Sequence, residues 1–324
     1  MKGIVQDSYG TAPEEVLRLA EVARPVIADS EVLVRVAAAS VDRGTWHLMA
    51  GIPYLMRIAG FGLRAPKATN PGRSFAGTVE SVGKDVTGFE PGDEVYGTSD
   101  NSFAEYAAAR PDKLALKPAS LTFEEAASLP VSAVTALQAV RHRGRVQAGQ
   151  KVLVIGASGG VGTFAVQLAK AFGAEVTGVS SPAKVDLVRA IGADHVLDYT
   201  REDVAGGDRR YDVILDTGGN RPLSQLRRAL TPRGRLVLVG GETDGRWIGG
   251  IDRQVRAQLL SLLVRQTLGT FVARENGKDL LALRDLVDAG KIKPVIDRTY
   301  PLHEAPAAIR YLVGGRARGK VVIT

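Results

Sequence analysis

Short hydrophobic runs alternate with amphipathic segments through the middle of the chain. The runs predict strands at 151–156, 175–180, 194–198, 211–216 and 234–240. Between these strands, helices are expected near 160–173, 182–192 and 221–231. Strands and helices that alternate in this way form a parallel sheet covered by helices on both faces. The pattern therefore predicts an α/β fold with a doubly wound parallel sheet.

The N-terminal part of the chain has a different pattern, typical of short strands and tight turns. Residues 31–38 partly alternate apolar and polar positions, as a half-buried strand does. Within residues 75–97, β-branched runs are interrupted at 83–85 and at 90–93, and residues 102–107 resemble one more strand. This part predicts a β-rich barrel or sandwich.

The two patterns meet near residue 120, where Thr122 and Glu125 have the spacing of a capping box that begins a helix. Further on, residues 278–290 predict a helix, and residues 319–324 predict a strand that returns to the first domain. The expected domains are a β-rich one formed by 1–120 and 275–324, and an inserted nucleotide-binding one formed by 121–274.

Composition narrows the possible chemistry. The 324 residues, 45% of them hydrophobic, are enough for two domains with cores of their own. The chain has no cysteine, which excludes disulfides and thiolate metal sites. The four histidines are scattered without the paired spacing of metal ligands, so no metal site is expected.

The distribution of charge and hydrophobicity bears on location and partners. No apolar run approaches the roughly 18 residues of a membrane span, and the first residues lack the features of a signal peptide. A cytoplasmic protein without membrane contacts is therefore expected. The formal net charge is +7, but Lys and Arg are spread along the chain without interleaved aromatic residues. We expect no specific nucleic-acid partner, and part of this charge suits an anionic cofactor.

A glycine-rich turn follows the first strand of the inserted domain. Residues 156–162 read Gly-Ala-Ser-Gly-Gly-Val-Gly and stand between the strand 151–156 and a helix. Glycines in this position allow a sharp turn, a close approach of the backbone to a pyrophosphate, and tight packing of the helix on the strand. The helix N-terminus then offers N–H groups to the phosphates. The expected cofactor-binding residues of the turn are Ser158, Gly159, Gly160, Val161 and Gly162.

The end of the second strand discriminates between the two nicotinamide cofactors. NAD-binding proteins usually have an acidic residue there, which binds the ribose 2′-hydroxyl. Here the strand ends at Ser180 and Ser181, while Glu175 lies at its opposite end. Lys184 follows, a cation suited to a 2′-phosphate, and Tyr199 is placed to flank the same site. This arrangement favours NADP(H) over NAD.

Several other motifs lead to a family resemblance. They lie at 71–83, 92–97, 129–136, 156–162, 192–194, 290–294 and 319–322. With these motifs over nearly its whole length, the chain resembles a zinc-free medium-chain dehydrogenase/reductase of the quinone oxidoreductase type. The resemblance implies a GroES-like β-rich catalytic domain, a Rossmann domain and a cleft between them. It also implies NADPH-dependent reduction of quinones, enones or similar carbonyls, usually by a homodimer.

The resemblance implies roles for particular residues. Positions matching Ser180, Lys184 and Tyr199 hold the 2′-phosphate in the family. Other family positions line the cofactor or run beside the nicotinamide, and they correspond to Thr135, Thr217, Gly218, Gly240, Gly241, Phe271 and Val272.

The chain departs from its apparent relatives between residues 42 and 74. Where zinc-using members have a Gly-His-Glu motif, this chain has Gly72, Arg73 and Ser74. Quinone reductases usually carry an Asn near Asp42 and an Asp near Thr45, and both are replaced here. The apolar segment 52–63 is longer than the loop expected of the family, and we expect it to form a wall or lid of the substrate cleft.

Without a metal, hydrogen bonds must polarise the substrate carbonyl, and a side chain or water must supply a proton. The candidates are His47, Asp42 and Tyr54. Each also has a structural interpretation: His47 packed beside Trp46, Asp42 as a hydrogen-bond acceptor, and Tyr54 as cleft wall.

Two other functions stay open at this point. One is a metal-free alcohol dehydrogenase or enoyl-thioester reductase, and the other is a catalytically weak redox sensor or nucleic-acid-binding protein.

Overall fold

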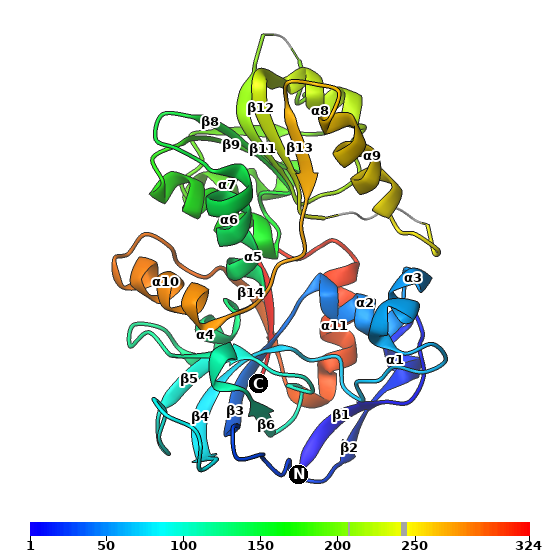
Figure 1. Ribbon diagram of the computed structural model, residues 1–324, viewed down its shortest axis with the longest axis vertical. Helices are drawn as coiled ribbons and strands as arrows, with labels where there is room; N and C mark the ends of the chain where they lie inside the picture. Colours follow the sequence, from blue (N-terminus) through cyan, green and yellow to red (C-terminus); the bar gives the residue numbers. More distant parts are fainter. Residues whose placement is uncertain (207, 241–244) are drawn as a thin grey trace. The chain divides into compact units, whose positions relative to one another are not determined.

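The computed structural model describes residues 1–206, 208–240 and 245–324. The chain divides into two compact units (Figure 1). Unit 1 comprises Met1–Val134, Glu275–Ala289 and Pro294–Thr324, and unit 2 comprises Thr135–Arg274 and Gly290–Lys293. Unit 1 includes residues 121–134, which the sequence pattern assigns to the inserted domain. As limits of independently folding domains, 1–120, 121–274 and 275–324 stay a prediction.

Unit 1 is built on strands and a few short helices. Its strands are β1 (Lys2–Gln6), β2 (Leu17–Glu21), β3 (Val32–Val41), β4 (Ser74–Val82), β5 (Glu94–Thr98), β6 (Tyr106–Ala109), β7 (Leu114–Leu116), β14 (Ile296–Tyr300) and β15 (Lys320–Ile323). Its helices are α1 (Pro13–Val16), α2 (Arg43–Ala50), α3 (Tyr54–Met56), α4 (Phe123–Ala127), α10 (Gly277–Asp288) and α11 (Ala305–Val313).

Most strands of unit 1 form one sheet in the order β14-β15-β3-β4-β5-β7, with β6 also paired to β3. The C-terminal strand β15 runs antiparallel to β3, with Val321 opposite Val41, so the end of the chain returns to the first unit as predicted. Inward-facing residues of this sheet, among them Phe75 and Val321, join Met49 of α2 and Phe103 in one buried hydrophobic core. This core holds the C-terminal part of α2 against the sheet.

Unit 2 is an α/β layer structure. Its strands are β8 (Lys151–Ile155), β9 (Glu175–Ser180), β10 (His195–Asp198), β11 (Tyr211–Asp216), β12 (Leu230–Leu238) and β13 (Thr267–Thr270). Its helices are α6 (Gly160–Ala171), α7 (Val185–Ala190), α8 (Leu223–Ala229) and α9 (Ile251–Ser261), while α5 (Ser132–Gln138) runs through the boundary between the units.

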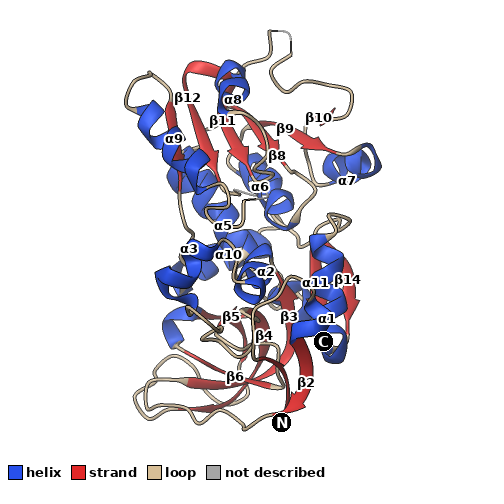
Figure 2. Cartoon of the chain, turned by 90° about the vertical axis from the view of Figure 1, so that its right-hand side faces the viewer, coloured by secondary structure: helices blue, strands red, loops and turns tan. Residues whose placement is uncertain are grey.

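The sheet of unit 2 is parallel, with the order β10-β9-β8-β11-β12-β13. The chain moves outward from β8 to β10 and then from β11 to β13 on the other side. Because crossovers between parallel strands are right-handed, helices of the two halves lie on opposite faces of the sheet. This strand order is that of the Rossmann fold, whose ligands bind where the order reverses, outside the carboxyl ends of the strands. Figure 2 shows strands of this sheet spread out beside one another, from β12 at the left to β10 at the right.

Several elements differ from the pattern-based expectation. The capping box of Thr122 and Glu125 does begin α4. In contrast, the strand expected at 102–107 begins only at Tyr106, because Phe103 is buried in the core and its carbonyl accepts a hydrogen bond from Ile4. Strand β13 and helix α9 were not predicted. β13 has only four residues, and α9 carries charged and apolar residues without a continuous apolar stripe.

None of the helices within the described residues is long and apolar enough to cross a membrane.

Candidate functional site

The glycine-rich turn between β8 and α6 needs its glycines for steric reasons. Gly156 has φ +80°, and a Cβ there would lie 2.5 Å from Thr217 Oγ1. A Cβ on Gly162 would lie 2.0 Å from the carbonyl oxygen of Gly156. Gly159 is the N-cap of α6 and provides no side chain to cap the first-turn N–H groups. These groups are therefore available to an anion, as in dinucleotide-binding turns.

The other predicted residues of this turn lie in the same place. Ser158 is buried between Gly156 and α6, and Gly160 and Val161 form the first residues of the helix. A nicotinamide dinucleotide fits this cradle, because side chains are missing where the backbone must approach a pyrophosphate.

At the end of β9, the structure brings together the residues predicted to select the cofactor. Ser180 is the last residue of β9, and the N–H of Tyr199 donates to its carbonyl oxygen at 3.2 Å. Ser181 begins a 3₁₀ turn in which the N–H of Lys184 donates to the Ser181 carbonyl at 3.0 Å. Tyr199 is half exposed. The backbones of Lys184 and Tyr199 thus lie beside the two serines that end this strand.

The acidic residues near β9 are engaged elsewhere. Glu175 lies at the far end of the strand, with its Oε1 3.2 Å from His195 Nε2. Asp198 pairs with Ser180 in the sheet register, but its Oδ1 accepts hydrogen bonds from the backbone and hydroxyl of Thr200 at 2.9 and 2.8 Å. Neither carboxylate occupies the position that binds a ribose 2′-hydroxyl in NAD-binding proteins.

The loops after β11 and β12 converge on the glycine-rich turn. Thr217 Oγ1 donates to the Ile155 carbonyl at 2.7 Å, and a Cβ on Gly240 would lie 2.7 Å from the Thr217 carbonyl. The N–H of Gly218 donates to the carboxylate of Asp216 at 3.2 Å. Gly241 lies outside the described residues. Thr217, Gly218 and Gly240 therefore lie together at the carboxyl edge of the sheet.

The remaining cofactor candidates lie near the same edge or in α5. Phe271 and Val272 directly follow β13, whose last residue, Thr270, donates from its hydroxyl to the Leu238 carbonyl at 3.0 Å. Val272 is exposed. Thr135 lies in α5 and is partly buried. Their contact with a cofactor stays a prediction.

In unit 1, Asp42 is held in a buried ion pair. Its Oδ1 lies 2.5 Å from the Nζ of Lys320, which is only 1% exposed, and accepts a hydrogen bond from Ser132 Oγ at 2.7 Å. The Lys320 ammonium also donates to Ser132 Oγ and to the Val41 carbonyl. This geometry supports the structural interpretation of Asp42: its carboxylate ties together the end of β3, the start of α5 and the last strand.

His47 lies on α2, which begins directly after Asp42. Its Nδ1 lies 2.8 Å from the carbonyl oxygen of Ile52, and its ring stands edge-on to Trp46. A carbonyl oxygen can only accept, so Nδ1 carries a hydrogen and Nε2 is the acceptor in the neutral ring. The Ile52 carbonyl thus fixes the orientation of the His47 ring.

Tyr54 belongs to the apolar segment 52–63, which an arginine fixes in place. The Arg57 guanidinium lies over the rings of Tyr9 and Tyr54, at 4.2 and 4.6 Å from their centroids. Its Nε donates to the Gly51 carbonyl at 2.8 Å. The Tyr9 hydroxyl lies 2.8 Å from the carbonyl oxygens of both Phe61 and Gly62, and burial raises its pKa despite the nearby Arg57.

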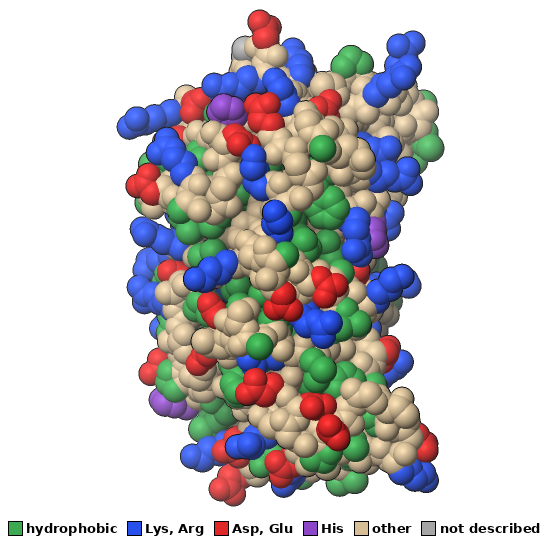
Figure 3. Space-filling view, turned by 90° about the vertical axis from the view of Figure 1, so that its left-hand side faces the viewer, with side chains coloured by type: hydrophobic (Ala, Val, Ile, Leu, Met, Phe, Trp, Pro, Cys, Tyr) green, Lys and Arg blue, Asp and Glu red, His purple; other side chains and the backbone are tan. Residues whose placement is uncertain are grey.

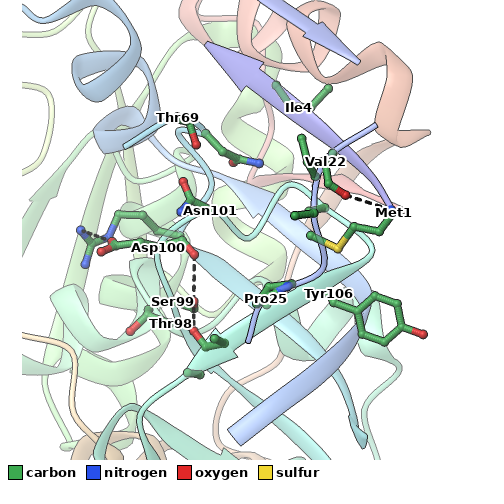
Figure 4. Close-up of a pocket in the computed structure, with 18 of the residues that line it drawn as sticks. Met1, Ile4, Val22, Pro25, Thr69, Thr98, Ser99, Asp100, Asn101 and Tyr106 are labelled. Atoms are coloured by element: carbon green, nitrogen blue, oxygen red, sulfur yellow. Dashed lines mark hydrogen bonds and ion pairs between the residues drawn. The ribbon is translucent and has the colours of Figure 1, made fainter. Parts of the chain in front are cut away.

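Two neighbouring pockets open in unit 1. One, of about 350 Å³, is lined by the 48–73 stretch, including Leu48, Phe61 and Arg73. The other, of about 470 Å³, is drawn in Figure 4 and lies between the N-terminal strand and the loop 98–101. Arg73 borders both, with Asp100 and Glu275 at 3.8 and 3.6 Å from its guanidinium. Gly60 and Phe61 of the segment 52–63 line the smaller pocket. That this segment forms a wall or lid of the substrate cleft stays a prediction.

Sequence reasoning missed three residues that organise these sites. Lys320 and Ser132 appeared only within family motifs, and Arg253, which binds Asp216, was not considered. A weak signal existed for Asp216, because an acidic residue at the end of a buried strand needs a partner. The partners themselves come from distant parts of the chain and leave no local pattern.

Comparison with known proteins agrees with this geometry. Residues 28–139 match the family described as alcohol dehydrogenase GroES-like domain, and residues 191–323 match the family described as zinc-binding dehydrogenase. The chain is 34% identical to the 2-methylene-furan-3-one reductase of Solanum lycopersicum, over 100% of this chain and 79% of that protein. It is 32% identical, with the same shares covered, to the chloroplastic NADPH-dependent alkenal/one oxidoreductase of Arabidopsis thaliana.

A solved structure is similar over its full length. The quinone oxidoreductase from Coxiella burnetii superposes with a TM-score of 0.84 and 30% sequence identity, covering 100% of this chain and 98% of that one. A GroES-like unit joined to a Rossmann unit with a glycine-rich turn defines a two-domain dehydrogenase/reductase. The chain belongs to the medium-chain dehydrogenase/reductase family and is an oxidoreductase.

The description of the second family raises the question of a zinc ion. The chain has no cysteine, and within the described ranges no group of three His, Asp or Glu side chains could hold a metal. These described donors do not form the set of ligands that zinc takes in proteins. That the reaction proceeds without a metal stays a prediction.

Replacing Lys320 by Met should destabilise the protein by about 3–5 kcal/mol, because the Asp42 carboxylate would remain buried without a counter-charge. The double variant Asp42→Asn/Lys320→Met should recover most of this loss. Urea unfolding of the three proteins measures the difference.

The control is Lys84→Met. Lys84 forms an exposed ion pair with Asp29 at 2.7 Å, and its loss should cost under about 1 kcal/mol. Equal destabilisation by Lys84→Met and Lys320→Met would contradict the importance of the buried pair.

Proposed function

We propose that the protein is a cytoplasmic, NADPH-dependent, metal-free reductase that transfers a hydride to a quinone, an enone or a related carbonyl compound. The observation that carries the proposal is the end of β9, where Lys184 and Tyr199 lie beside the Ser180–Ser181 backbone, while Glu175 is at the opposite end of the strand and Asp198 accepts hydrogen bonds from Thr200. The substrate class is supported by the names of the relatives, which include an alkenal/one oxidoreductase and a quinone oxidoreductase.

The residues that would hold the cofactor follow from the fold. The turn 159–162 would bind the pyrophosphate at the N-terminus of α6, and Ser180, Lys184 and Tyr199 would bind the 2′-phosphate. Thr217 and Gly240 follow β11 and β12, which belong to the second half of the sheet. In Rossmann folds this half binds the second mononucleotide. Bound NADPH supplies the hydride.

The chain's own residues would orient the substrate and supply the proton. Asp42 is committed to Lys320, so we assign it a positioning role at the start of α2. His47, whose Nδ1 lies against the Ile52 carbonyl, would supply the proton from Nε2. The segment 52–63 would cover the substrate and exclude water, held by Arg57 and Tyr9.

A nucleic-acid-binding function is less well supported. On the face drawn in Figure 3, Lys and Arg side chains are interspersed with Asp and Glu and form no continuous basic stripe. Phosphate backbones are bound by clustered cations, which this face does not present.

The first experiment measures NADPH oxidation with a panel of quinones, enones, aldehydes and an enoyl thioester. We expect turnover of an enone or quinone and none of simple aldehydes. Preferential turnover of the enoyl thioester would favour the alternative reductase, and NADPH binding without turnover of any compound would contradict the enzymatic proposal.

With the best substrate, His47→Gln should lower kcat by about 100-fold if Nε2 moves the proton. An unchanged kcat would exclude that role.

Lys184→Ala should weaken NADPH binding at least about tenfold and leave NADH binding nearly unchanged, because a charge-assisted contact to the 2′-phosphate is lost. Fluorescence titration of both cofactors measures the two dissociation constants. Arg189→Ala is the matched control, since Arg189 is exposed on the adjoining helix α7 and pairs with Asp186. Equal losses for NADPH and NADH would contradict the assignment.

We also propose a homodimer formed through the edge of the unit 2 sheet. β13 is the last strand of this sheet, and beside it α9 and the following residues expose Val255, Leu259, Leu262 and Leu263 at 48%, 60%, 82% and 83%. Exposed apolar patches and unpaired strand edges are features that a partner covers. A second copy is the occupant that the family resemblance implies.

Light scattering tests the dimer directly. The wild type should have twice the chain mass of 34.3 kDa, and Leu259→Glu should shift the protein toward the monomer. Leu281→Glu changes an exposed leucine of unit 1 and should leave the mass unchanged. A monomeric wild type would refute this interface.

A further inference from the structure

Arg253 reaches from α9 to the end of β11, where it contacts the most deeply buried carboxylate of unit 2. Its Nη2 lies 2.5 Å from Asp216 Oδ2, and its Nε donates to the Arg221 carbonyl at 3.0 Å. The Asp216 side chain is 0% exposed and that of Arg253 is 11% exposed. The guanidinium thus holds both ends of the segment 216–221 from a helix that follows it in the chain.

Asp216 in turn organises two loops at the carboxyl edge of the sheet. Its Oδ1 accepts hydrogen bonds from the N–H groups of Gly218 and Gly219 at 3.2 and 2.9 Å. Its backbone carbonyl accepts from Val239 and Gly240 at 2.9 and 3.1 Å. One residue therefore connects the loop after β11 with the loop after β12.

These loops belong to the half of the sheet formed by β11, β12 and β13. In a Rossmann fold the two halves each bind one mononucleotide of the cofactor. The turn after β8 and the end of β9 serve the adenosine half, so the loops held by Asp216 serve the nicotinamide half. The orientation of these loops decides how the nicotinamide half is bound.

We infer that Arg253 is a positioning residue for the nicotinamide half of the cofactor, acting through Asp216 on Gly218 and Gly219 after β11 and on Val239 and Gly240 after β12. The inference rests on the proposed NADPH-dependent function. A buried ion pair adds little net stability compared with apolar residues of similar size, but its directional hydrogen bonds can fix a local geometry. Arg253 Nη1 is buried without a hydrogen-bond partner among the described residues, so Nη2 and Nε are the two atoms that hold Asp216 and the Arg221 carbonyl.

The experiment compares two ligands on Arg253→Gln. NADPH occupies both halves of the site, while adenosine 2′,5′-bisphosphate occupies only the adenosine half. We expect the dissociation constant of NADPH to rise about 10- to 100-fold, corresponding to the loss of one or two charge-assisted contacts. The dissociation constant of adenosine 2′,5′-bisphosphate should stay within about twofold of wild type, because Ser180 and Lys184 are untouched.

Two further variants make the result specific. Arg253→Lys retains a cation for Asp216 but cannot also bind the Arg221 carbonyl as the guanidinium does, so NADPH binding should be partly restored. This variant also keeps the test valid if Arg253→Gln does not fold. Arg256→Gln is the matched control, since Arg256 lies on the same helix and makes an exposed ion pair with Asp252 at 3.4 Å. It should change neither dissociation constant.

Three outcomes would overturn the inference. Equal weakening of both ligands would show a general structural role, and unchanged NADPH binding in Arg253→Gln would show no role in the site. Loss of NADPH affinity in Arg256→Gln would show a non-specific effect of charge on α9. Failure of the wild type to bind either ligand would instead refute the proposed function on which the inference rests.

Discussion

A carboxylate that is removed from water at the end of a strand is stabilised by a neighbouring cation, and in the described part of the chain each unit shows this arrangement. Asp42 directly follows β3, and Asp216 ends β11. Their partners, Lys320 and Arg253, reach them from distant elements at 2.5 Å. In a low-dielectric interior the loss of either cation would leave a charge whose desolvation is not repaid. The backbone around each carboxylate is therefore fixed by its ion pair.

The two pairs act on different parts of the reaction. Lys320 joins the last strand to the beginning of α2, so the position of His47 depends on the C-terminal end of the chain. Arg253 connects α9 to the loops beside the glycine-rich turn. The first pair concerns the proposed substrate side and the second concerns the cofactor side. Neither cation needs to touch the reacting atoms to affect the reaction.

A structural feature could be predicted from the sequence where its physical cause lies within a few neighbouring residues. The turn 156–162 and the capping box at Thr122 were predicted because both have local steric or hydrogen-bonding causes. The parallel sheet followed from alternating hydrophobic patterns, although the four-residue strand β13 was too short to stand out. The ion pairs were not predictable in this way. Lys320 and Asp42 are 278 positions apart, and a lysine in a C-terminal strand has no local feature that marks it as buried.

Helix α9 shows how one short segment can serve two purposes that sequence patterns cannot separate. Arg253 and the buried Ala257 are one helical turn apart and face the sheet, while Val255 and Leu259 form the exposed side. A charged residue on the inner side and apolar residues on the outer side invert the usual amphipathic pattern, which is why no helix was predicted there. The inversion has a physical reason in each case: the inner charge meets Asp216, and the outer apolar residues suit the proposed second copy. A hydrogen bond is lost when its donor and acceptor move apart by about 1 Å. The packing of α9 on β13 sets the position of the Arg253 guanidinium, and it therefore also affects the backbone that Asp216 holds.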